Sequence, residues 1–262
     1  MPSVRTPGVE QIPGLAVLDN LARFYQQHGH RLALTGGAVR DFLMGRPYID
    51  LDVVSDARPA RTQELLTRWA GHAVHSDNPF GVVSCTAHDL KIQVLTYRTP
   101  RDRYPDFDPR LLRADPLENQ LMCADVTINT AAILLPGHEW LDPFGAAADV
   151  AARMLRPPVD PHVAILSHPP TMLRYARFVA ELGFQVSPEM LAAMRALAAT
   201  LEPHLNWGTV VTLTKILTAP DPQAGVAVLQ ETGLLRHLPL RWQDRLCSGS
   251  SSEQSSGRIN HR

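Results

Sequence analysis

Two aspartates, two positions apart, are the first residues of this chain that could do chemistry together. Asp50 and Asp52 fall in segment 48–54, where apolar and acidic residues alternate as in a half-buried strand. Successive side chains of a strand point to opposite faces, so both carboxylates project from the same face. Paired carboxylates bind hard divalent cations, and Mg²⁺ uses one or two of them together with phosphate oxygens. The spacing therefore predicts a magnesium site.

A glycine pair precedes the aspartates. Gly36 and Gly37 stand between an apolar run at 31–35 and a possible helix at 39–44. Backbone N–H groups at a strand-to-helix turn can bind phosphate without obstruction by a side chain, and Arg40 is the natural charge partner. Metal carboxylates facing a phosphate-binding turn are typical of phosphoryl or nucleotidyl transfer. Each pattern alone is also ordinary, because D-x-D is commonly the solvated face of a strand and Gly-Gly is commonly a turn.

The elements that must position these residues follow from hydrophobic spacing and from Gly and Pro boundaries. In the first half we expect helices at 13–29, 39–44 and 58–71, strands at 31–35 and 48–54, and a hairpin formed by 82–86 and 91–97. The stretch 99–120 is rich in Pro, Arg and Asp and is predicted to be a loop. In the second half we expect helices at 170–182, 188–201, 209–217 and 224–235. This order predicts an α/β head followed by a helical second domain.

The composition limits the classes of protein to which this chain can belong. The chain has 262 residues, of which 45% are hydrophobic, so it can bury a core and is not disordered as a whole. Its net charge is -1, but residues 1–150 hold 14 basic and 18 acidic residues whereas residues 151–262 hold 11 and 8. An acidic half followed by a basic half favours a polyanionic partner. From residue 248 onward a Ser-rich tail is predicted to be disordered.

The compartment is inferred from cysteines and from apolar runs. Cys85, Cys123 and Cys247 are far apart without a CxxC pair, which argues against a disulfide scaffold or a zinc ribbon and fits a reducing environment. No run approaches the ~18 apolar residues of a membrane helix, and the N-terminal residues lack the apolar block of a signal peptide. We therefore expect a cytoplasmic protein that does not contact a membrane.

Segment 34–56, LTGGAVRDFLMGRPYIDLDVVSD, resembles the head motif of the class II tRNA nucleotidyltransferases and bacterial poly(A) polymerases, GG-x-VRD-x-L-x-G followed by D-x-D. These enzymes are members of the polymerase-β superfamily. Four later segments are similar to motifs of this family in the same order: 91–98 to its strand ending in TTFR, 123–130 (CADVTINT) to RRDFTINA, 140–149 to IDPFGG-x-x-D, and 173–184 to LRAxRFAAxLGF.

The resemblance implies an α+β fold with two domains and a tail. A polymerase-β-like nucleotidyltransferase head, a small mixed sheet with helices, would occupy residues 1–156. An all-helical neck that binds RNA would follow at 157–247, and the disordered tail at 248–262.

The resemblance also implies roles for five residues of the head. Asp50 and Asp52 would be the catalytic ligands of Mg²⁺, with two ions present during catalysis. Gly36, Gly37 and Arg40 would hold the nucleoside triphosphate, CTP or ATP.

Four further residues would complete the nucleotide site. Asp125 and Asn129 would lie near the ribose, and Arg174 and Arg177 would lie at the neck side of the base pocket. These two arginines are three positions apart on one face of the expected helix, where they could serve solvent or nucleotide equally well. The RNA 3′ end, expected to be that of a tRNA, would be the acceptor.

The chain departs from the family pattern within the site. Gln93 stands where the family usually has Glu, and it cannot supply a carboxylate's charge. Cys123 and Ala124 replace the arginine pair of RRDFTINA. In the neck motif E-D-x-x-R, the Asp and Arg that read the base are His168 and Thr171 here.

Three functions are compatible with these residues. The first is a template-independent RNA nucleotidyltransferase that adds C, A or both to a 3′ end with Mg²⁺ and releases pyrophosphate. The second is a weakened or inactive relative that binds nucleotide or RNA without transfer. The third is nucleotidyl transfer to a small molecule, because one fold serves several chemistries.

Overall fold

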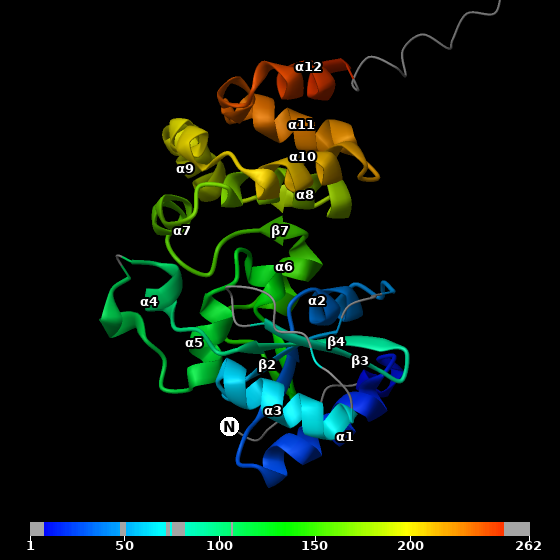
Figure 1. Cartoon of the computed structure of the whole chain (residues 1–262). Helices are drawn as coiled ribbons and strands as arrows, with labels where there is room; N and C mark the ends of the chain where they lie inside the picture. The colour runs from blue at the N-terminus through cyan, green and yellow to red at the C-terminus, as the bar shows by residue number, and fades with distance from the viewer. Residues whose placement is uncertain (1–7, 48–50, 72–73, 75–81, 106, 249–262) are drawn as a thin grey trace, which may run out of the picture. The chain divides into compact units, whose positions relative to one another are not determined.

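The computed structural model of the chain describes residues 8–47, 51–71, 74, 82–105 and 107–248 (Figure 1). The chain forms two compact units, Met1–Ala152 and Arg153–Arg262. The sequence placed the domain boundary after residue 156, and that boundary stays a prediction. Each unit is described by itself below.

The first unit is built on one six-stranded sheet with the strand order β3-β4-β2-β1-β5-β6. The strands are β1 (Leu32–Thr35), β2 (Leu51–Ser55), β3 (Val82–Ala87), β4 (Leu90–Thr96), β5 (Ala132–Leu135) and β6 (Glu139–Leu141). The pair β2–β4 is parallel, and the other neighbours are antiparallel. The sheet is therefore mixed, as the resemblance implied, and the predicted hairpin of β3 and β4 is confirmed.

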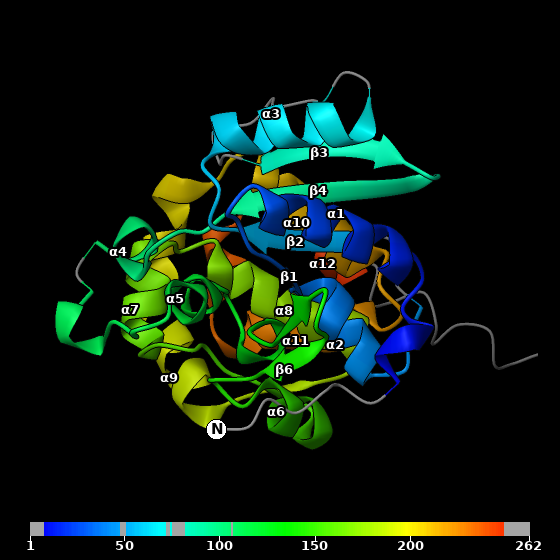
Figure 2. The same cartoon turned by 90° about the horizontal axis from the view of Figure 1, so that it is seen from below.

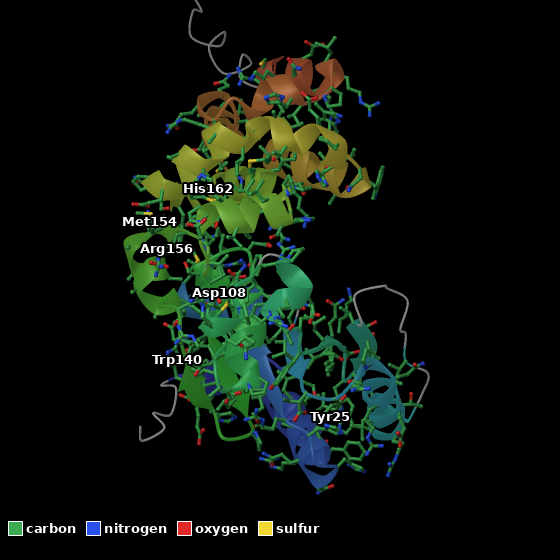
Figure 3. The ribbon with its side chains drawn as sticks, turned by 90° about the vertical axis from the view of Figure 1, so that its left-hand side faces the viewer. Tyr25, Asp108, Trp140, Met154, Arg156 and His162 are labelled. Atoms are coloured by element: carbon green, nitrogen blue, oxygen red, sulfur yellow. The ribbon has the colours of Figure 1, made fainter. Side chains whose placement is uncertain are left out.

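One face of this sheet carries the main apolar core. It is covered by α1 (Leu15–Gln27) and α3 (Pro59–Ala70), which lie beside the strands in Figure 2. Leu18, Leu21 and Tyr25 recur at helical spacing on α1 and are fully buried in that core. Figure 3 marks Tyr25 on this helix and Trp140 on the edge strand β6. Burial in this apolar environment raises the pKa of the Tyr25 hydroxyl.

The opposite face carries a smaller cluster. Alternate residues of the central strands reach it and pack against α5 (Pro116–Met122); the buried members are Ala33, Val54, Leu117, Leu121 and Ala132. Because strand residues alternate between faces, each central strand contributes to both clusters.

The expectation of a loop across 99–120 was wrong in part. This stretch contains α4 (Pro100–Arg103), a 3₁₀ turn and the whole first turn of α5. The side chain of Asp115 accepts from Leu117 N at 2.8 Å and caps α5, with Pro116 at its first position. An N-cap followed by proline is a helix start signal, which the weak apolar period of the segment concealed.

The second unit is helical apart from one short strand pair. Its helices are α7 (Pro161–Ser167), α8 (Thr171–Leu182), α9 (Pro188–Leu197), α10 (Trp207–Leu217), α11 (Pro222–Glu231) and α12 (Leu240–Ser248). Strands β7 (Met154–Leu155) and β8 (Gln185–Val186) pair in parallel. Ser187 caps α9, as its position predicted, whereas α7 and α12 were not expected from the sequence. Ser248 ends α12, and the rest of the predicted tail lies outside the described residues.

Candidate active site

The glycine turn joins β1 to α2 (Gly37–Leu43). Gly36 caps this helix with φ 72° and ψ −138°, a backbone conformation that only glycine adopts without strain. A Cβ placed on Gly36 would lie 3.8 Å from Asp52 Oδ2. The glycine turn and the Asp52 carboxylate, which come from different elements, are therefore neighbours in the fold.

Asp52 lies on β2 and faces the side of the sheet away from the main core. Its strand neighbours Leu51 and Val53 point into the main core and are at most 2% exposed, whereas Asp52 is half-buried. The parallel register sets Asp52 beside Gln93 of β4. With its nitrogen turned toward the aspartate, the Gln93 amide donates to Asp52 Oδ1 over 3.2 Å and accepts from Lys91 Nζ over 3.3 Å. Gln93 therefore contacts the predicted metal ligand directly.

Asp50, the second predicted metal ligand, lies outside the described residues. Within the described part of the chain, no three His, Cys, Asp or Glu side chains are grouped closely enough to hold a metal. The Asp52 carboxylate nevertheless suits Mg²⁺, which binds through one or two carboxylates and completes its shell with water and substrate phosphates. The absence of a Cβ at Gly36 leaves room for such a phosphate next to the Asp52 carboxylate.

Arg40 is itself paired with a carboxylate and an amide oxygen. Its Nε and Nη2 donate to the two carboxylate oxygens of Asp41 at 2.9 and 3.0 Å, and its Nη1 donates to Asn129 Oδ1 at 3.2 Å. The arginine is held in one orientation by this fork, with 14% of its side chain exposed. The structure thus brings together Arg40 and Asn129, two of the predicted nucleotide-binding residues.

Contacts with α6 (Ala146–Ala152) fix the turn that carries Asn129. The hydroxyl of Thr127 donates to Asp149, and both residues are buried. Asp142 accepts from the backbone N–H groups of Ala146 and Ala147 at 2.6 and 3.0 Å, so it caps α6. Both aspartates of the segment 140–149 therefore support the geometry of the site.

Asp125 forms an ion pair with α4. Arg103 Nη2 lies 2.8 Å from Asp125 Oδ1, and the Asp125 side chain is 7% exposed. This partner was not among the predicted site residues.

Arg174 and Arg177 lie on α8, in the second unit. Arg177 Nε is 3.4 Å from Glu181 Oε2, one helical turn away, and its guanidinium carbon is 4.6 Å from the centre of the Phe178 ring. Thr171, the first residue of this helix, is only 1% exposed. The second unit gives Arg177 local partners, and its structure does not test the predicted role of either arginine at the base.

Sequence reasoning missed three supporting residues. Asp41 adjoins Arg40 in the V-R-D element, and that adjacency was a usable signal for the fork. Asp149 was visible as the last aspartate of the 140–149 segment. Arg103 had no such signal, because its partner Asp125 is distant in the sequence and on another element.

Comparisons with known proteins identify similar chains. Residues 32–156 match the family model described as Poly A polymerase head domain. A CC-adding tRNA nucleotidyltransferase of Shouchella clausii is 29% identical over 211 residues, 80% of this chain and 50% of that protein. A Multifunctional CCA protein of Pseudomonas paraeruginosa is 36% identical over 214 residues, 78% of this chain and 49% of that protein. This chain spans about half the length of these curated relatives.

Comparison of the fold with solved structures also identifies a similar protein. The crystal structure of the Bacillus stearothermophilus CCA-adding enzyme in complex with CTP matches with a TM-score of 0.76 and 26% identity, over 91% of this chain and 57% of that one. The chain has a glycine turn beside a strand aspartate on this sheet, and it is similar to these relatives. It therefore belongs to the family of class II tRNA nucleotidyltransferases and bacterial poly(A) polymerases.

Proposed function

We propose that this protein is a template-independent nucleotidyltransferase that adds C, A or both from CTP or ATP to the 3′ end of an RNA, in the first instance a tRNA. The observation that carries the proposal is the approach of Asp52 Oδ2 to the Gly36 turn, 3.8 Å from where a Cβ would stand. The names of the relatives, CC-adding and CCA proteins, supply the class of substrate.

The proposed roles follow from position and charge. Asp52, together with Asp50, would hold Mg²⁺, which neutralises triphosphate charge when bound. The backbone N–H groups at Gly36 and Gly37 would bind the phosphates at the start of α2. Arg40, held by Asp41, would present a fixed positive charge to the same group.

The remaining roles concern the sugar, the base and the acceptor. Asp125 and Asn129 would bind the ribose, and Arg174 and Arg177 would lie at the base. In the reaction, the 3′ hydroxyl of the RNA attacks the α-phosphorus, a new phosphodiester bond forms, and pyrophosphate leaves. A cytoplasmic location, where tRNA and nucleotides are present, is part of this proposal.

The test is nucleotide addition to defined RNA ends. The protein is incubated with Mg²⁺ and either labelled CTP or labelled ATP, on tRNA ending before, within or after CCA. We expect extension of the shortened tRNA, and its loss in Asp52→Asn. Asp89→Asn is the matched control, because Asp89 is exposed in the β3–β4 turn and its φ of 62° suits asparagine. Absence of incorporation with every acceptor would contradict the proposal.

A second candidate function is binding of nucleotide or RNA without transfer. The Gln93 amide favours it, because this neutral group bonds Asp52 at the position where the family usually has a carboxylate. Under this function, CTP or ATP stabilises the protein against heat, but no labelled nucleotide reaches any RNA. Transfer to a small molecule, the third function, would consume the nucleotide without labelling RNA once a small-molecule acceptor is added to the same assay.

A further inference from the structure

The α4 segment is firmly docked on the residues that precede Asp125. Gln120, which is buried, accepts from the backbone N–H of Arg98 at 2.7 Å and so fixes the start of the segment. The buried Tyr104 donates its hydroxyl hydrogen toward the carbonyl oxygens of Met122 and Ala124, at 3.2 and 3.3 Å. Side chains therefore tie the segment at both ends of α4.

The docking brings a guanidinium to Asp125. Arg103 lies between these two anchors and reaches Asp125 Oδ1 at 2.8 Å, with only 16% of its own side chain exposed. Burial to 7% exposure removes most of the water around the Asp125 carboxylate, and an arginine at this distance offsets that loss. The Arg103 guanidinium carbon also lies 5.8 Å from the centre of the ring of the anchored Tyr104, and its ion pair with Asp125 restricts the direction of that carboxylate.

The small residues at 123 and 124 make this docking possible. The Cys123 thiol is buried and lies 3.8 Å from the carbonyl oxygen of Arg98 and 3.4 Å from that of Asn119. A longer side chain at position 123 would need the space that the docked segment occupies. In the motif RRDFTINA, which residues 123–130 resemble, arginines occupy these two positions. Compared with that motif, this chain lacks two cations beside Asp125 and has one from α4 instead.

We propose that Arg103 is a positioning residue for nucleotide binding: through its ion pair it holds the Asp125 carboxylate in place for the ribose of the incoming nucleotide, and it supplies from α4 a positive charge that Cys123 and Ala124 do not. This inference rests on the proposed function, because it assigns a role to a residue that acts through Asp125. Arg103 itself need not touch the nucleotide.

The first experiment measures equilibrium binding of labelled CTP and ATP, with Mg²⁺, to the wild type and to three variants. Arg103→Gln removes the charge, Arg103→Lys keeps it without the planar fork, and Arg101→Gln is the matched control. Arg101 is on the same helix and is exposed, so this control carries the same change of charge and side chain. The loss of a charge-assisted hydrogen bond predicts an increase in Kd of about 10- to 100-fold for Arg103→Gln. Arg103→Lys is expected to recover part of the loss, and Arg101→Gln to bind like the wild type.

The second readout separates positioning from a merely structural effect. If Asp125 binds the ribose, the ratio of affinities for CTP and 2′-deoxy-CTP falls in Arg103→Gln, whereas a general loosening weakens both equally. In an Asp125→Asn background, Arg103→Gln should then have little further effect, because contacting residues are not additive. Melting temperatures of all variants identify any that fail to fold, and Arg103→Lys serves in place of Arg103→Gln if that variant unfolds.

The outcomes are distinct. A wild type that binds neither nucleotide contradicts the proposed function itself, and with it this inference. A wild type that binds, together with an Arg103→Gln variant that is folded and matches Arg101→Gln in affinity and ribose preference, overturns the role of Arg103 and leaves the proposed function standing.

Discussion

The two faces of the head sheet use the same strands for different purposes. One face, under α1 and α3, carries the main apolar core, in which Tyr25 and several leucines are fully buried. The other, against α5, has a small cluster and carries Asp52 and Gln93 at its margin. Since β-strand residues alternate, a single strand such as β2 can hold Val53 in the core and Asp52 in the site. Residues that pack the core and residues of the candidate site are therefore separated here by alternation along one strand rather than by distance.

The largest expected effect is a loss of activity without a loss of stability. Asp52→Asn removes a carboxylate worth several kcal/mol of charge stabilisation, so the rate of nucleotide addition should fall by about 10³-fold. The melting temperature should stay close to that of the wild type, because the side chain is outside the main core. Rates and thermal unfolding of Asp52→Asn and Asp89→Asn together give the measurement. A comparable drop in stability would break the proposed separation of the two faces.

The complementary change is made on the core face. Leu34 is fully buried against α1 and α3, and Leu34→Ala should lower the free energy of unfolding by about 2–5 kcal/mol. Leu134, which lies on the neighbouring strand β5, is half-buried on the other face, and Leu134→Ala should cost less. Urea unfolding of the pair measures the difference. The Kd for CTP of both variants, measured where they are folded, should equal that of the wild type, and a selective loss in Leu34→Ala would contradict the comparison.

Glycine substitution distinguishes a strained turn from a site. Gly36→Ala forces a Cβ onto a positive φ and should destabilise the fold by about 1–3 kcal/mol. Gly71→Ala is the matched control, because Gly71 also has φ 72° but no atom lies within 4 Å of where its Cβ would stand. Gly71 has ψ 12°, in the left-handed region that alanine tolerates better than the ψ of −138° at Gly36, so we expect the larger loss of stability by calorimetry in Gly36→Ala and weaker CTP binding only in that variant. Equal CTP binding by both variants would contradict the proposed binding of phosphate at this turn.

The last expected effect is on the stability of the fold at alkaline pH. Burial raises the pKa of the Cys123 thiol from 9.0 to about 11. The folded state therefore favours the protonated thiol, and this contribution is complete below pH 9 and lost as the pH rises from 9 to about 11. By linkage it is at most about 3 kcal/mol. Unfolding free energies across this range should depend less on pH in Cys123→Ala.

Cys247→Ala is the control for this measurement, because Cys247 is exposed. It should follow the wild-type profile throughout. Alkylation of the native protein near pH 8 should correspondingly label Cys247 before Cys123 or the buried Cys85. Rapid labelling of Cys123 would show that the α4 segment is not docked over it.

Much of the fold was predictable because its signals are local. Period-2 alternation located β2 to β4, glycines and prolines marked the ends of the helices, and Ser187 indicated the cap of α9. In the part of the chain that the structure describes, no helix combines the length and apolar character of a bilayer span. Local signals failed in 99–120, where α4 and α5 are stabilised by packing rather than by an apolar period of their own.

The candidate site divides in the same way. By itself, the sequence determined the glycine turn, the position of Asp52 on a strand and the family motifs around them, since each depends on residue type and short spacing. Only the tertiary structure decided that Gln93 lies beside Asp52, because β2 and β4 pair in parallel across an intervening helix and strand. It also decided that Asn129 holds Arg40 and that Arg103 holds Asp125. Such partners meet because burial and strand register bring distant segments together, and no local spacing encodes that register.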